Sequence, residues 1–93
     1  MRTITVSIGN SDNKLTQRQW SEFVNHIDSL IREISAQVHF FGGSPNWERW
    51  QNTAWVFDCA REVTPDLKNS LKEYKQMYKQ DSIAYIEGET EFL

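Results

Sequence analysis

The 93-residue sequence has little that would tie the chain together covalently or carry it across a membrane. It contains one cysteine, Cys59, so no disulfide can form within the chain, and a reducing compartment is indicated. No apolar run approaches the ~20 residues that a bilayer-spanning helix needs. The N-terminal residues also lack the apolar stretch of a signal peptide. We therefore expect a cytoplasmic protein.

Positive charge is scarce as well: 10 Lys and Arg residues stand against 13 Asp and Glu, for a formal net charge of −3. Proteins that bind a phosphate backbone or an anionic membrane carry a basic surplus, so this balance argues against both kinds of partner. At 39% hydrophobic and 25% charged residues, the composition is that of a globular protein, and the length allows one domain over residues 1–93. Aromatic residues are the abundant class, with four Trp, three Tyr and five Phe.

Hydrophobic periodicity predicts two helices and four strands. Thr16 as N-cap and Gln19 form a capping box at the start of the first helix, and Thr64-Pro65 marks the start of the second. Asp81-Ser82 ends the second helix. The first helix is expected over residues 17–35, and the strands over residues 3–8, 37–41, 53–59 and 83–86.

This order predicts an α+β fold of the ferredoxin-like βαββαβ kind, with a four-stranded antiparallel sheet and two helices on one face. The superfold hosts many unrelated functions and implies none of them. We expect Phe40 and Val56 to face the helices, which leaves Phe41, Trp55 and Phe57 on the open face. Such a patch is a liability on a monomer, so a second subunit, the loop between the middle strands or a ligand should cover it.

The link between the second and third strands, residues 42–52, is long for a hairpin, and long loops in small domains often carry function. Flat rings and guanidinium groups are common anchors for ligands and partner proteins. The competing interpretation is a subunit interface or a loop packed on its own sheet. The candidate binding residues here are Phe41, Trp47, Arg49, Trp50, Trp55 and Phe57.

The turn over residues 9–14 is a second candidate binding element. Backbone N–H groups close to a helix N-terminus can hold an anion, and Ser11, Asn13 and Lys14 would add donors. The glycine spacings of phosphate-binding and dinucleotide-binding loops are absent, and Asp12 would repel an anion. An ordinary polar turn is therefore the competing interpretation.

His39 is the weak catalytic candidate, because an imidazole in a pocket beside aromatic rings can act as a general base. Asp58 is the one carboxylate that cross-strand proximity offers to orient it. A structural or surface imidazole is the alternative. The histidines and Cys59 show no paired ligand spacing, so we expect no metal and no cofactor.

The sequence leaves three functional hypotheses. The favoured one is a non-catalytic homodimer or higher oligomer that holds a small molecule or partner protein with the aromatic hairpin and the first turn. A small, acidic, motif-free domain of this kind resembles phage or mobile-element accessory proteins. The first alternative is an enzyme of the dimeric α+β barrel type with His39 as base. The second resembles the RNA-recognition motif, with bases stacked on Trp55 and Phe57, although Thr5 stands where that module needs an aromatic.

Overall fold

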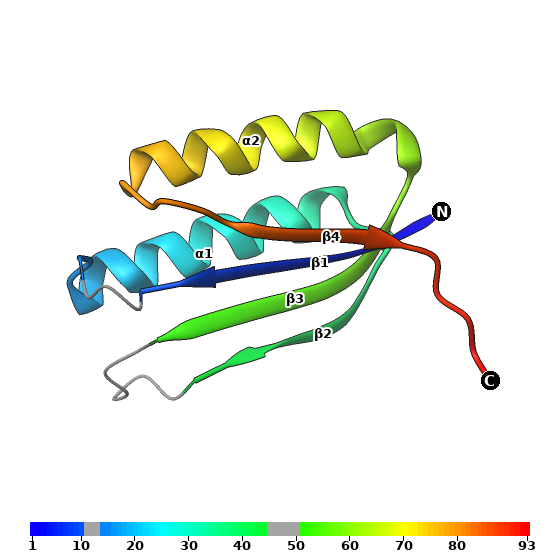
Figure 1. The fold of residues 1–93 in the computed structure, drawn as a ribbon, viewed down its shortest axis with the longest axis horizontal. Coiled ribbons are helices and arrows are strands. Elements are labelled where there is room, and N and C mark those ends of the chain that lie inside the picture. The colour runs from blue at the N-terminus through cyan, green and yellow to red at the C-terminus, as the bar shows by residue number, and fades with distance from the viewer. Residues whose placement is uncertain (11–13, 45–50) are drawn as a thin grey trace.

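The computed structural model describes residues 1–10, 14–44 and 51–93. All four strands form one antiparallel sheet in the order β2-β3-β1-β4, and both helices run along it in opposite directions (Figure 1). The predicted α+β βαββαβ fold is therefore confirmed. The elements are β1 (Arg2–Gly9), α1 (Gln17–Ile34), β2 (Gln37–Gly43), β3 (Asn52–Cys59), the 3-10 turn η1 (Arg61–Val63), α2 (Thr64–Met77) and β4 (Ala84–Gly88).

The start of α1 is set by its local sequence, as predicted. The Thr16 hydroxyl accepts the Gln19 N–H at 3.2 Å, and the Gln19 side chain accepts the Thr16 N–H at 2.9 Å. This capping box satisfies two backbone donors that the first turn of the helix leaves unpaired. The apolar stripe that follows is buried at Trp20, Phe23, Ile27 and Ile31.

The helix α2 begins where the sequence predicted it, but its N-cap is different. Thr64 is already inside the helix, because η1 runs directly into it. The Thr64 hydroxyl donates to the Arg61 carbonyl at 2.9 Å and does not accept from the first turn as an N-cap would. Pro65 still lies in the first turn, where its missing N–H costs no helical hydrogen bond.

The hydrophobic core lies between the two helices and one face of the sheet, and here the predicted orientation is wrong. Trp55 and Phe57 are fully buried under the helices, whereas Val56 and Phe40 lie on the open face. The physical reason is that β3 carries two large rings and Cys59 on one face, and Asp58 on the other. Burying the rings removes more apolar area from water and leaves the carboxylate solvated.

A β-bulge at His39 sets the faces of β2. Val38 pairs with Phe57 and Phe40 pairs with Val56, so His39 is the extra residue between them. The bulge turns Phe40 to the open face and Phe41 to the helix face. There the Phe41 ring centroid lies 5.3 Å from that of Trp55.

Candidate functional site: the open face of the sheet

One row of side chains crosses all four strands on the face that the helices leave uncovered. Phe40 pairs with Val56, Val56 with Thr5, and Thr5 with Ile86. Phe40 is 53% exposed and Ile86 is 65% exposed, so both ends of the row present apolar surface to solvent. We call these four residues the apolar row. It is the part of the open face best suited to contact another apolar surface.

The neighbouring row consists of small residues, which keeps this part of the face flat. Gly42, Ala54, Ser7 and Ala84 are paired across the strands. A Cβ atom on Gly42 would lie only 3.0 Å from the Phe40 ring, so that ring lies over the glycine. A side chain at position 42 would push the ring away from the sheet, and the glycine therefore helps to keep the surface level.

The row on the other side is polar and centres on Asp58. His39 Nε2 lies 2.8 Å from Asp58 Oδ2, and the Thr3 hydroxyl donates to Asp58 Oδ1 at 2.8 Å. Both the His39 and the Asp58 side chains are about three-quarters buried. The hydrogen bond from Thr3, then the contact with His39, hold the pKa of the Asp58 carboxyl below its ordinary value of 3.8. Asp58 is therefore the orienting carboxylate that cross-strand proximity suggested for His39.

The C-terminal segment that follows β4 contacts this polar row. The Thr90 hydroxyl is hydrogen-bonded to the Thr3 hydroxyl. After Gly88 the chain leaves β4 at the end of the sheet where the N-terminus lies, and it extends away from the strands (Figure 1). Phe92 and Leu93 are exposed there.

The structure describes four of the predicted binding residues: Phe41, Trp55 and Phe57 on the helix side of the sheet, and Lys14 in the β1–α1 turn. Trp55 and Phe57 are core residues, so they cannot stack on a base or a ligand from the open face, and the RNA-binding hypothesis loses both of its rings. Phe41 is partly exposed on the helix side, where the Arg32 guanidinium lies 5.8 Å from its ring centroid. Trp47, Arg49, Trp50, Ser11 and Asn13 lie outside the described residues.

The described part of the β1–α1 turn has a structural role. Asn10 is fully buried, and its side chain donates to the Leu15 carbonyl and accepts the Leu15 N–H, both at 3.1 Å. The buried Gln51 side chain donates to Gln17 at 2.9 Å. Lys14 is exposed, and its Nζ lies 3.8 Å from Asp81 Oδ1. The Asn10 contacts close the turn on itself, the Gln51 contact joins the start of α1 to the start of β3, and the Lys14 contact joins the turn to the segment before β4.

Phe40 and Ile86 were not predicted to lie at the surface, because an apolar residue in a strand is most often buried. The signal that could have found Phe40 is Asp58, which shares a face of β3 with Val56, the cross-strand partner of Phe40. A carboxylate in a sheet strand favours the solvated face. Ile86 carried no such signal.

Two further properties concern the described part of the chain. Neither of its helices is long and apolar enough to cross a membrane. It contains no cluster of three or more His, Cys, Asp or Glu side chains arranged to hold a metal ion.

Cys59 is buried on the helix face, and that burial raises the pKa of its thiol.

Comparison with known proteins supports the fold. The sequence matches no protein-family model, and no curated protein matches it significantly. Among solved structures, it is similar to the solution structure of a hypothetical protein from Arabidopsis thaliana, with a TM-score of 0.59 and 12% sequence identity. The match covers 98% of this chain and 89% of the plant protein. At this identity the likeness establishes a shared α+β fold over nearly the whole chain.

Proposed function

We propose that this protein is a non-catalytic homodimeric binding protein that associates through the open face of its sheet and holds a small apolar molecule between the two sheets. The observation that carries the proposal is the apolar row: Phe40 and Ile86 are more than half exposed at its two ends. Contiguous apolar surface of this kind on a soluble protein marks an interaction site. A second copy of the same face would cover it through a twofold axis, which is the commonest symmetry of homo-oligomers.

The distribution of charge supports the same conclusion. A quarter of the residues of the chain are charged. Nevertheless, Asp58 is the one carboxylate among the strand positions of the open face, and Lys and Arg do not occur at those positions. That carboxylate is already hydrogen-bonded to Thr3 and His39. Depletion of charge at the centre of a contact surface is the compositional mark of a protein interface.

The polar row would close one end of the space between two sheets. An apolar site needs few polar groups to fix the orientation of its ligand. His39, Asp58 and Thr3 lie at the edge of the apolar row and offer hydrogen-bonding groups there. We therefore expect the ligand to be an uncharged, largely apolar molecule with one polar end.

Analytical ultracentrifugation of the whole chain tests the association. The wild-type protein should sediment with twice the mass of one chain. Ile86→Glu should raise the dimer dissociation constant by about 30-fold or more, since an unpaired buried charge at an interface costs roughly 2–5 kcal/mol. Met77→Glu is the matched control, because Met77 is 62% exposed, close to the value for Ile86, and lies at the end of α2.

Two results would contradict the proposal. One is a wild-type chain that remains monomeric at its highest soluble concentration. The other is a dimer that Met77→Glu disrupts and Ile86→Glu leaves intact, because the interface would then lie on the helix side. Native mass spectrometry of the dimer would report any retained small molecule in the same sample.

A second candidate function, proton transfer by His39, is favoured by one specific observation: the 2.8 Å contact between its Nε2 atom and Asp58. When Nε2 donates to the carboxylate, Nδ1 carries the lone pair that can take a proton from a carbon acid. The test is deuterium incorporation at the methyl group of acetophenone in D₂O, followed by NMR. Enzymatic exchange should disappear in His39→Gln and persist in His26→Gln, whereas exchange at the buffer rate with wild-type protein rules this function out.

A further inference from the structure

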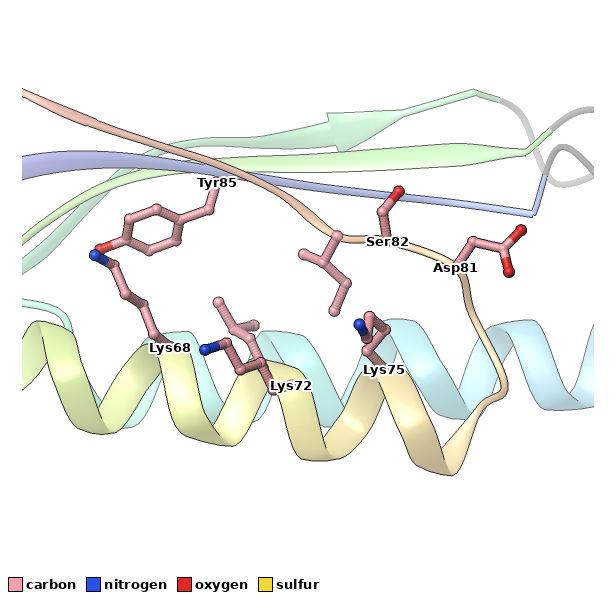
Figure 2. A pocket seen from close by; sticks show the side chains of 8 residues that line it. Lys68, Lys72, Lys75, Asp81, Ser82 and Tyr85 are labelled. Atoms are coloured by element: carbon pink, nitrogen blue, oxygen red, sulfur yellow. The ribbon is translucent and has the colours of Figure 1, made fainter.

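A cavity of about 270 Å³ opens between α2 and the segment that leads into β4, on the side of the molecule opposite the open face. Figure 2 shows lysine side chains rising from α2 on one side, and Tyr85, Ser82 and Asp81 on the other. The cavity is lined by Lys68, Leu71, Lys72, Lys75, Asp81, Ser82, Ile83 and Tyr85.

The floor of this cavity is apolar. Leu71 belongs to the buried core, and Ile83 and Tyr85 are partly buried hydrophobic residues packed against it. The space is thus an extension of the core surface that no described side chain fills. Apolar walls with a few polar groups at the rim are the usual composition of a small-molecule site.

The rim carries three lysines from one face of α2. Lys68, Lys72 and Lys75 are four and three residues apart, a spacing that places them on the same side of a helix. Within the described residues, none of the three ammonium groups has a carboxylate at ion-pair distance. Asp81 is the one acidic residue of the lining, and it lies 3.8 Å from Lys14. The lining of the cavity therefore has an excess of positive charge, although the protein as a whole has a net charge of −3.

Tyr85 adds a protonated hydroxyl to the wall. Its hydroxyl donates to Glu87 Oε1 at 2.7 Å, and burial followed by this hydrogen bond raises the pKa of Tyr85. The phenol is neutral, as an ordinary phenol is at neutral pH. The negative charge at this end of the wall is that of Glu87, whose Oε2 lies 3.8 Å from Arg2 Nε. The Lys68 ammonium lies 5.0 Å from the centroid of the Tyr85 ring, which places that cation directly beside the apolar wall.

We propose that the cavity between α2 and β4 binds a small apolar carboxylate, with its hydrocarbon part on Leu71, Ile83 and Tyr85 and its carboxylate among the three lysines. The volume of about 270 Å³ is just below the usual range for ligand sites, about 300–1,000 Å³, which suits one or two fused rings or a short chain. Lysine ammonium groups recognise an anion as mobile point charges, so the charge of the ligand matters more than its exact geometry. The site is separate from the open face and does not depend on dimer formation.

NMR titration of the full chain with 2-naphthoate tests this inference, and uncharged 2-naphthalenemethanol is the matched probe of similar shape. Naphthoate should shift the resonances of Leu71, Ile83 and Tyr85 and bind more weakly as salt is added. Lys72→Gln should raise its dissociation constant by about two- to fivefold, and replacement of all three lysines by Gln on the order of tenfold. The control Lys79→Gln removes a charge just beyond the C-terminal end of the same helix, outside the lining, and should change the constant by less than about twofold.

The inference fails if the alcohol binds as tightly as the carboxylate, because charge recognition would then be absent. It also fails if the shifts map to Phe40, Val56 and Ile86, since the probe would then occupy the open face. Absence of saturable binding, or an unchanged constant in the triple variant, contradicts it as well. The lysines are at the surface, and thermal melting of each variant will establish that the fold is intact.

Discussion

The indole Nε1 of Trp55 donates a hydrogen bond to Oδ1 of Asp28 over 2.9 Å, from the centre of β3 to the middle of α1. Asp28 is also paired with Arg32, whose Nε lies 3.0 Å from both carboxylate oxygens. The Arg32 guanidinium in turn lies near the Phe41 ring, which contacts Trp55. Each of these four side chains contacts the next, and together they join α1 to the strands β2 and β3.

Loss of the indole N–H should therefore destabilise the fold measurably. Trp55→Phe is expected to lower the free energy of unfolding by about 1–3 kcal/mol, because Asp28 loses a donor and the smaller ring leaves space in the core. Urea denaturation measures this change. In a double-mutant cycle with Asp28→Ala, which removes the acceptor, the two effects should be non-additive. Strict additivity would show that the hydrogen bond contributes nothing.

Asp58 should make stability depend on pH on the acid side. Its folded-state pKa lies below the ordinary 3.8, so the folded state favours the ionised carboxylate. The resulting stabilisation is fully present above the ordinary pKa of 3.8 and is lost as the pH falls from there through the lower folded-state pKa. Asp58→Asn should therefore show a shallower loss of stability in acid than the wild type when urea denaturation is followed at a series of pH values.

Thr3 is the largest cause of that shift, and its effect can be measured directly. Thr3→Val removes the hydroxyl that donates to Asp58 Oδ1 while keeping the size and shape of the side chain. We expect the pKa of Asp58 to rise toward 3.8, as followed by NMR of the carboxylate carbon. Thr5→Val, on the same face and strand, is the control. An Asp58 pKa that responds equally to both substitutions would assign the shift to something other than this hydrogen bond.

Cys59 should be unreactive in the native protein. Its thiol is fully buried and burial raises its pKa, whereas the thiolate is the reactive form. A disulfide reagent that releases a chromophore should therefore modify it at the rate of global unfolding, and quickly in urea. The variant Ser29→Cys in a Cys59→Ala background places a thiol on the exposed face of α1, away from the sheet, and should react at once. Fast modification of native Cys59 would mean that the core opens locally at β3.

Asn10 should contribute more to stability than an ordinary turn residue. Asn10→Ala leaves the Leu15 N–H and carbonyl without their side-chain partner in a buried place, at a cost of about 2–3 kcal/mol. Asn69→Ala, on the exposed face of α2, is the matched control and should be neutral or slightly stabilising, because alanine has the higher helix propensity. Equal values for the two variants in thermal denaturation would remove the structural role assigned to Asn10.

The candidate site could be predicted only in part, and the reason differs from residue to residue. The contact between His39 and Asp58 follows from strand pairing, so cross-strand proximity in the sequence was enough to suggest it. The cavity beside α2 was not foreseen. Lysines on a helix flank look like an ordinary solvated face until the opposite wall, which comes from residues 81–85, is known.

The sequence by itself determined the order of the elements and the start of α1, because capping hydrogen bonds and alternation of apolar residues act over a few neighbouring positions. It also grouped Trp55 with Phe57, and Phe40 with Val56, on opposite faces. Alternation did not show which group the helices cover, since it is the same for both faces of a strand, and Asp58 was the one sequence signal for the solvated face. The tertiary structure decided the choice, because it depends on the total area buried by the whole fold. The bulge at His39, which turns Phe40 outward, was likewise decided by pairing with β3.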